Sequence, residues 1–98
     1  MKNLTLRNLT KVCNGIWHGD NALLDQEISA ITTDSRKIEK DCLFVPIVGE
    51  RVDAHRFIPD VMTKGALATL SERELPEADY AYIQVEASLQ AVKDIAEF

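Results

Sequence analysis

Three consecutive segments decide the fold of this chain: Ile31-Thr32-Thr33-Asp34-Ser35-Arg36, then Leu43-Phe44-Val45-Pro46-Ile47-Val48-Gly49-Glu50, then Asp53-Ala54-His55-Arg56-Phe57-Ile58. A polar Thr-Asp-Ser-Arg cluster ends the first apolar run, and a Gly-Glu-Arg-Val-Asp turn ends the second. Loops at strand ends are where α/β sheets place ligand-binding groups. The segments therefore predict an α/β domain with polar groups gathered at one edge of a sheet.

Apolar runs along the chain predict a small mixed β-sheet flanked by helices. The predicted strands are residues 15–19, 27–32, 43–48, 66–71 and 80–85. Pro46 lacks the N–H that a strand ladder needs, so we expect an edge position or a bulge there. Trp17 is expected to pack in the core rather than to offer a stacking surface for a base.

Helix signals flank these strands. Thr5 can cap a first helix, which Gly15 is expected to stop. The apolar residues of this helix at helical spacing are Leu6, Leu9, Val12 and Cys13. Pro59 suits the first turn of a helix over residues 58–64, with Gly65 as its cap. That helix returns the chain to the sheet by a crossover.

Composition limits the classes of function. The chain has 98 residues, 46% of them hydrophobic, and a net charge of -5, which fits one small domain and speaks against a nucleic-acid-binding surface. The stretch from residue 31 to 58 is formally neutral. Its cations are Arg36, Lys37, Lys40, Arg51 and Arg56, and its anions are Asp34, Glu39, Asp41, Glu50 and Asp53. An anionic ligand such as a diphosphate could therefore approach this stretch.

No signal peptide or membrane-spanning run is evident, so we expect a cytoplasmic protein without membrane contact. Cys13 and Cys42 are expected to be small buried hydrophobes. A zinc site built from these two cysteines with His18 and His55 is not favoured, because their spacing is irregular. We therefore expect no metal site in this chain.

The ordered motifs resemble the N-terminal, UDP-binding domain of the Mur ligases of peptidoglycan synthesis. The motifs are Thr-Asp-Ser-Arg, Leu-Phe-Val, Gly-Glu, Asp-x-His-x-Phe-Ile and the later Lys64-Gly65-Ala66. The resemblance runs from Leu4 to the last residue. It is greatest to the MurF type, which joins D-alanyl-D-alanine to UDP-N-acetylmuramoyl-tripeptide. The alternatives are the MurE type, which adds the third amino acid, and a stand-alone nucleotide-binding or interaction module.

The resemblance implies that this chain binds the UDP part of its substrate and holds no catalytic residue. The residues that match the family's UDP-binding segments are Thr33, Ser35, Arg36, Gly49, Glu50, Arg51, Val52, Asp53 and His55. Thr33 and Ser35 would contact the uridine, although the same cluster could simply form a turn. Arg36 could serve a phosphate or a carboxylate such as Asp53, and the structural pairing is favoured. His55 could contact the ligand or orient its loop.

Two positions depart from the family's pattern. Lys40-Asp41-Cys42 stands where Pro-Gly-Asp is usual, and Asp53-Ala54-His55 stands where Asp-Gly-His is usual. Asp41 can adopt the left-handed conformation that glycine would take. If Ala54 had to adopt positive φ, the cost would be about 1 kcal/mol and the loop could change shape.

The end of the chain leads us to expect a longer parent protein. Ser88 can cap a last helix, and no stop signal follows that helix. Its apolar residues are Leu89, Val92, Ile95 and Ala96. No phosphate-loop motif is present, so ATP chemistry is not expected within residues 1–98. The resemblance implies that central and C-terminal domains of the parent use ATP and magnesium, and that this domain alone is inactive.

Overall fold

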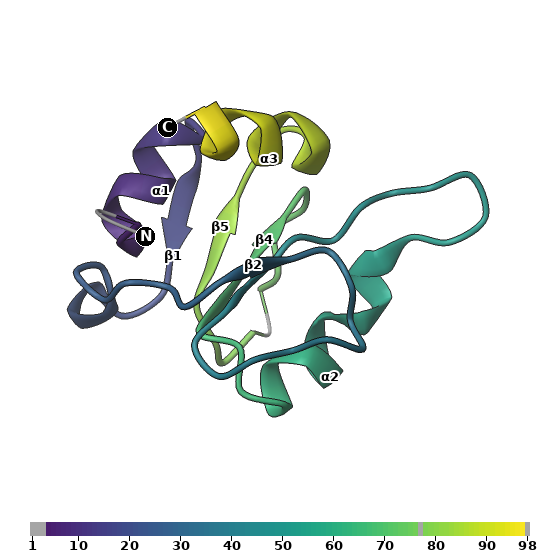
Figure 1. Ribbon diagram of the computed structural model, residues 1–98, viewed down its shortest axis with the longest axis horizontal. Coiled ribbons are helices and arrows are strands. Elements are labelled where there is room, and N and C mark those ends of the chain that lie inside the picture. The colour runs from purple at the N-terminus through teal and green to yellow at the C-terminus, as the bar shows by residue number, and fades with distance from the viewer. Residues whose placement is uncertain (1–3, 77, 98) are drawn as a thin grey trace.

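The computed structural model describes residues 4–76 and 78–97. Within these residues a mixed sheet has the strand order β1-β5-β4-β3-β2 (Figure 1). The strands are β1 (Ile16–His18), β2 (Ile31–Thr32), β3 (Leu43–Phe44), β4 (Ala68–Ser71) and β5 (Tyr82–Gln84). β1 runs antiparallel to β5, and all other neighbours are parallel. The predicted mixed α/β sheet is confirmed.

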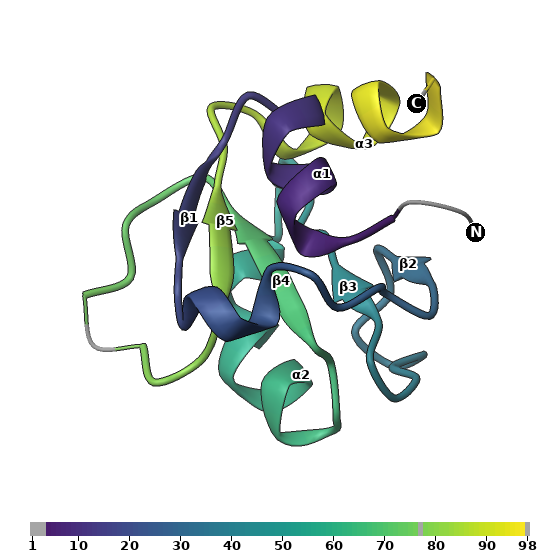
Figure 2. The same cartoon turned by 90° about the vertical axis from the view of Figure 1, so that its left-hand side faces the viewer.

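Helices cover both faces of this sheet (Figure 2). They are α1 (Leu6–Val12), α2 (Ile58–Thr63) and α3 (Ser88–Glu97), with short 3-10 helices η1 (Asn21–Leu23) and η2 (Ala54–Phe57). Successive residues of β3 point to opposite faces, so Leu43 packs with the core beneath α1 and α3, while Phe44 packs with the core beneath α2. None of the helices described is long and apolar enough to cross a membrane.

The ends of α1 follow partly from the predicted signals. The Thr5 hydroxyl accepts a hydrogen bond from the Asn8 N–H at 3.1 Å, which confirms Thr5 as the cap. Gly15 is not the stop, because Asn14 makes the left-handed turn with φ of 54°. Gly15 is instead required by a close approach to β5. A Cβ on Gly15 would lie 2.5 Å from Ile83 Cγ2.

The expectation of an edge or a bulge at Pro46 is wrong. β3 lies inside the sheet, between β4 and β2, and it ends at Phe44. Pro46 is fully buried just beyond that end, where no ladder donor is needed from it. Trp17 packs against the main core as predicted, and Cys13 and Cys42 are buried as free thiols.

The predicted cap of α3 is also wrong. Ser88 is the first residue of that helix, and its buried hydroxyl has no hydrogen-bond partner within the described residues. The carboxylate of Glu72 does the capping, because its Oε2 accepts from the Ser88 N–H at 2.6 Å. An acidic group after β4 thus supports the start of the helix that follows β5.

Candidate functional site

The candidate site lies at the carboxyl ends of the parallel strands. The first loop, residues 33–37, follows β2, and the second loop, residues 47–53, follows β3. Both lie at the same edge of the sheet because β2 and β3 are parallel neighbours. The second loop projects beyond the body of the molecule at the right of Figure 1. The structure therefore brings together the two segments from which the sequence predicted a ligand site.

The first loop is a turn built around Asp34. Its Oδ1 accepts from the Arg36 N–H at 2.9 Å and from Arg36 Nε at 3.1 Å, while Oδ2 accepts from Arg36 Nη2 at 3.2 Å. The hydrogen bonds from the Arg36 side chain hold the pKa of the Asp34 carboxyl below its usual range. Arg36 therefore has a structural carboxylate partner, as favoured, but that partner is Asp34, two residues away in the same turn, and not Asp53.

The remaining first-loop residues face outward from this turn. Thr33 is exposed and Ser35 is half-buried. Lys64, just after α2, reaches the Ser35 carbonyl with its Nζ at 3.4 Å and pairs with Asp60 at 3.0 Å. The contact engages the Ser35 backbone rather than its hydroxyl. The first loop therefore presents two hydroxyls and the exposed Arg36 guanidinium at the edge of the sheet.

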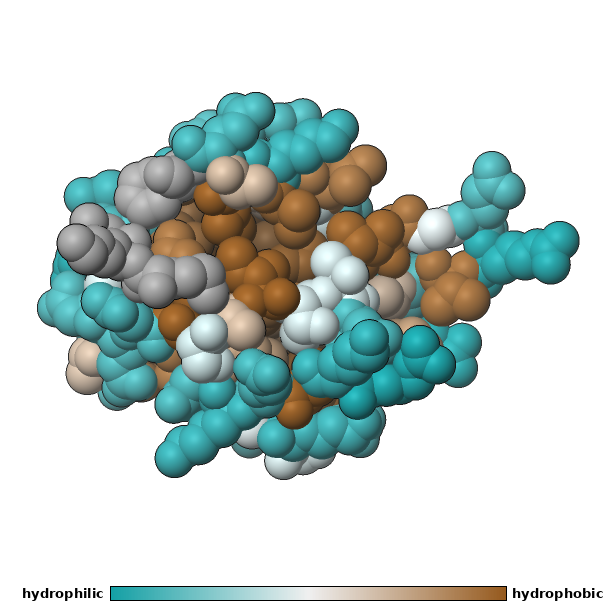
Figure 3. Space-filling view, in the orientation of Figure 1, coloured by the Kyte–Doolittle hydropathy of each residue, from teal (hydrophilic) through white to brown (hydrophobic). Residues whose placement is uncertain are grey.

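The second loop is a narrow hairpin. Val48 and Asp53 form an antiparallel bridge, and the Gly49 N–H donates to the Val52 carbonyl at 2.9 Å. Glu50 and Arg51 at its tip are exposed, and the space-filling view shows hydrophilic side chains at this tip (Figure 3). Positive φ among the described non-glycine residues occurs at Asn14 and Asp41, so Ala54 adds no such strain.

The turn at Asp41 confirms the other expectation about the departures from the family's pattern. Asp41 has φ of 65°, the left-handed conformation expected of it. Its N–H donates to the Gly65 carbonyl at 2.9 Å, and its carbonyl accepts from the Ser29 N–H at 3.0 Å. Aspartate therefore supports this turn without glycine.

Asp53 is the centre of the hydrogen bonds at the base of the hairpin. Its Oδ1 accepts from the His55 N–H at 2.9 Å and from His55 Nδ1 at 2.7 Å, and its Oδ2 pairs with Arg73 Nη2. The His55 N–H, followed by Arg73, holds the pKa of the Asp53 carboxyl well below its usual range. Arg73 was missed by sequence reasoning. The signal for it was its place just after a predicted parallel strand, which puts it at this edge.

His55 is held by the protein at both ring nitrogens. Nδ1 faces Asp53, and Nε2 lies 2.8 Å from the Glu72 N–H, which can only donate. The hydrogen-bond network therefore assigns a neutral ring with its proton on Nδ1. His55 is buried, and this geometry favours the loop-orienting alternative over ligand contact.

The arrangement suits binding rather than covalent chemistry. Hydroxyls, backbone groups and guanidinium groups can recognise a polar anionic ligand, whereas a serine nucleophile needs a base within hydrogen-bond reach. His55 is already engaged, and His18 lies in β1 at the opposite end of the sheet, stacked on Tyr82 with ring centroids 4.4 Å apart. Within residues 4–76 and 78–97, no group of three or more His, Cys, Asp or Glu side chains is placed to hold a metal ion.

A cavity of about 490 Å³ lies at that opposite end of the sheet, lined by His18, Tyr80 and Tyr82 among others. It contains none of the residues predicted to bind a ligand. The candidate site consists instead of the two loops that follow β2 and β3.

Comparison with known proteins connects this geometry to a family. The model of the "Mur ligase family, catalytic domain" matches residues 27–98. The chain is 41% identical over 76 residues to UDP-N-acetylmuramoyl-tripeptide--D-alanyl-D-alanine ligase of Buchnera aphidicola subsp. Baizongia pistaciae, covering 76% of this chain and 16% of that protein. It is 46% identical over 76 residues to UDP-N-acetylmuramoyl-L-alanyl-D-glutamate--2,6-diaminopimelate ligase of Cytophaga hutchinsonii, covering 74% and 15%.

Solved structures agree with these relatives. The crystal structure of MurF from Acinetobacter baumannii superposes with a TM-score of 0.81 and 33% identity over 92% of this chain and 19% of that one. MurF from Thermotoga maritima in complex with ADP gives a TM-score of 0.61 and 28% identity over 68% and 16%. The chain therefore spans less than a fifth of the length of each of these proteins.

Proposed function

Because the chain belongs to the Mur ligase family, we propose that it is the N-terminal domain of a MurF-type ligase and binds the UDP part of UDP-N-acetylmuramoyl-tripeptide. The observation that carries the proposal is the meeting of the first and second loops at one edge of the sheet. The likeness to MurF over 92% of the chain supports the assignment of type. The ligase would join D-alanyl-D-alanine to this substrate in peptidoglycan synthesis, in the cytoplasm.

Each loop has a distinct part in the proposed binding. Thr33 and Ser35 offer hydroxyls that can donate to and accept from the uridine, and Arg36 lies beside them with an exposed guanidinium. Gly49 to Val52 would wrap the nucleotide with backbone and side-chain groups, because the hairpin projects from the sheet edge. Asp53 and His55 support this second loop from its base.

The proposed division of labour leaves ligation to the rest of the enzyme. The sequence contains no phosphate-loop motif, and the described residues hold no cluster suited to a metal. The domain would contribute by anchoring a remote part of the substrate. Binding energy from such a part can hold the reacting end in place. The isolated domain is therefore expected to have no ATPase or ligase activity.

The MurE type is a second candidate, because a diaminopimelate ligase shares 46% identity with 74% of this chain. The two types differ in the amino-acid substrate of the whole ligase. Assaying the longer protein with D-alanyl-D-alanine and with diaminopimelate, each with its own UDP-linked acceptor, would separate them. Ligation of diaminopimelate alone would reject the MurF assignment and leave the UDP-binding proposal standing.

Titration of the domain with UDP, followed by amide NMR signals, tests the binding proposal. We expect shifts concentrated at residues 33–36 and 49–55. ADP is the matched control, because it carries the same diphosphate on a different base and should cause smaller shifts. Shifts confined to the acidic loop at residues 72–79, or equal shifts with UDP and ADP, would show that these loops do not recognise uridine.

A further inference from the structure

We propose that Arg73 is a positioning residue that holds the second loop in its binding conformation by acting through Asp53. The identity of the ligand rests on the proposed function, but the effect on the loop can be measured without any ligand. Arg73 follows β4 rather than β3, so it lies outside both loops that would contact the nucleotide. Its role is to fix the base of the hairpin from the neighbouring strand.

The hairpin depends on its base because little else holds it. Val48 and Val52 are each 48% exposed, and Glu50 and Arg51 are exposed between them. The backbone bonds that close the hairpin run from Gly49 to Val52 and across the bridge between Val48 and Asp53. With so few core contacts, the exposed turn can open without unfolding the domain. Its order therefore depends on how firmly Asp53 is held.

The support for Asp53 comes from a rigid element. Arg73 Nη2 pairs with Asp53 Oδ2, and the Glu72 N–H donates to His55 Nε2. Two successive residues after β4 thus hold the two partners, Asp53 and His55, that are already bonded to each other. The Arg73 backbone is fixed in turn by Ser71, which is fully buried.

Ser71 sets the backbone from which Arg73 reaches the hairpin. Its hydroxyl donates to the Arg73 carbonyl at 2.6 Å and accepts from the Arg73 N–H at 3.1 Å. The Arg73 side chain itself is 55% exposed, so its ion pair is screened and contributes little to global stability. Loss of the pair should therefore loosen the loop far more than it destabilises the core.

Such loosening would weaken binding, because a ligand must then order the loop as it binds. This expectation separates positioning from a general structural role. A purely structural residue would change the melting temperature and the affinity together. A positioning residue changes the local opening of the loop and the affinity while the melting temperature stays nearly constant.

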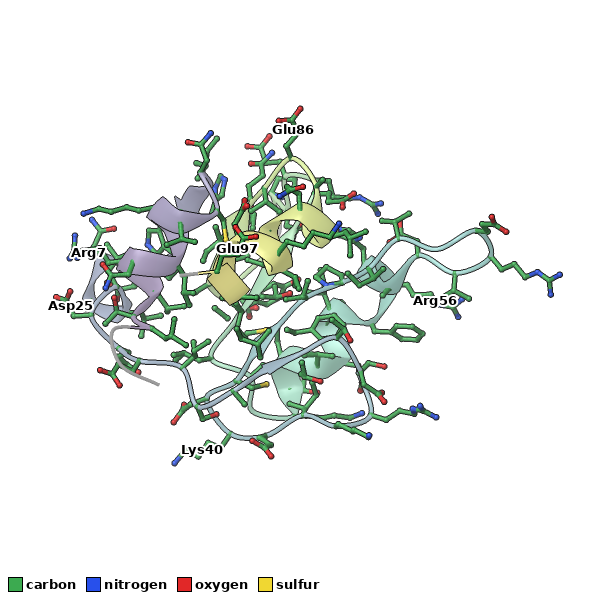
Figure 4. The ribbon with its side chains drawn as sticks, turned by 45° about the horizontal axis from the view of Figure 1, so that its top comes forward. Arg7, Asp25, Lys40, Arg56, Glu86 and Glu97 are labelled. Carbon is green, nitrogen blue, oxygen red and sulfur yellow. The ribbon has the colours of Figure 1, made fainter. Side chains whose placement is uncertain are left out.

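Hydrogen exchange of the ligand-free chain tests the proposal directly. In Arg73→Ala, amide exchange at Gly49 and at Ala54, whose N–H donates to the Ile47 carbonyl at 3.2 Å, should accelerate roughly fivefold. Arg73→Lys keeps a cation and should restore part of the protection. Arg7→Ala is the matched control, since it breaks the exposed ion pair with Asp25 far from the loop (Figure 4).

UDP affinity completes the test. We expect the Kd for UDP to rise roughly fivefold in Arg73→Ala and to stay unchanged in Arg7→Ala, with melting temperatures within a few degrees of the parent. Unchanged exchange at Gly49 and Ala54 in Arg73→Ala would overturn the positioning role, as would a Kd that follows the melting temperature alone. If the parent chain fails to bind UDP, the proposed function fails, and the exchange result still decides the role of Arg73.

Discussion

Replacing Gly15 with alanine should destabilise the domain by forcing β1 away from β5. The new Cβ would lie 2.5 Å from Ile83 Cγ2 and 2.9 Å from the Gln84 carbonyl oxygen, whereas ordinary contacts begin at 3.4 Å. A displacement of roughly 0.9 Å from the Ile83 side chain and roughly 0.5 Å from the Gln84 backbone oxygen is therefore needed. Overpacking of this kind costs about 1–3 kcal/mol. Since 1 kcal/mol lowers the melting temperature of a domain this size by about 4–8 °C, we expect a loss near 10 °C.

Gly49→Ala is the matched control for this substitution. A Cβ at Gly49 meets only the Val52 carbonyl oxygen at 3.3 Å, in an exposed hairpin. Its free energy of unfolding should stay within about 0.5 kcal/mol of the parent, because the Val52 carbonyl lies in an exposed hairpin that can yield by the small distance needed. Urea unfolding at equilibrium measures both variants. Equal stability of Gly15→Ala and the parent would refute the argument that glycine is needed for the approach of β1 to β5.

Three further predictions concern the binding site, the last helix and the buried thiol. In the longer ligase, Ser35→Ala should raise KM for the UDP-linked substrate roughly fivefold and leave kcat nearly unchanged. The reason is that one neutral hydrogen bond contributes about 1 kcal/mol in the ground and transition states alike. A loss of kcat by orders of magnitude would instead place Ser35 in the chemical step. Glu72→Ala should lower the free energy of unfolding by about 1 kcal/mol in urea titrations, because it removes the carboxylate that caps α3. Glu72→Gln should lower this free energy by less. An unchanged free energy of unfolding in both variants would exclude the cap. Burial raises the pKa of Cys13 to about 11, so about one Cys13 thiol in a thousand is ionised at pH 8. A thiol reagent should therefore modify Cys13 only in denaturant. Rapid labelling of Cys13 in the native chain would contradict its burial.

Local signals in the sequence predicted much of the fold. Thr5 caps α1, and Pro59 lies in the first turn of α2, because both preferences depend on the backbone groups of one helix end. Asp41 takes the left-handed turn for an equally local reason. The predicted strands are all represented, yet the run at residues 27–32 yields only β2, Ile31–Thr32. Strand length depends on which partner is beside the chain, and sequence periodicity does not contain that information.

The same limit explains what was missed at the site. The two loops could be placed at one edge because parallel strands put their carboxyl ends together. The partner of Arg36 and the cap of α3 could not be predicted, since each was decided by a competing side chain: Asp34 in the first case and Glu72 in the second. Arg73 reaches Asp53 across 20 residues of sequence, so the strand order had to be known before the pair could be proposed.

The position of β1 in the sheet limits how far this domain can fold while it is being synthesised on the ribosome. β1 is synthesised early, yet within the described residues it pairs with β5 alone, and the register joins Ile16 to Gln84. The helix that precedes β1, α1, likewise contacts α3, which is synthesised after β5. A nascent chain that stops short of β5 therefore leaves β1 without its strand partner and α1 without its contact with α3, while β2, β3 and β4 can already pair. Completion of the fold must wait until β5 and α3 have emerged, and termination before β5 would release a product in which β1 is unpaired, a form prone to aggregation.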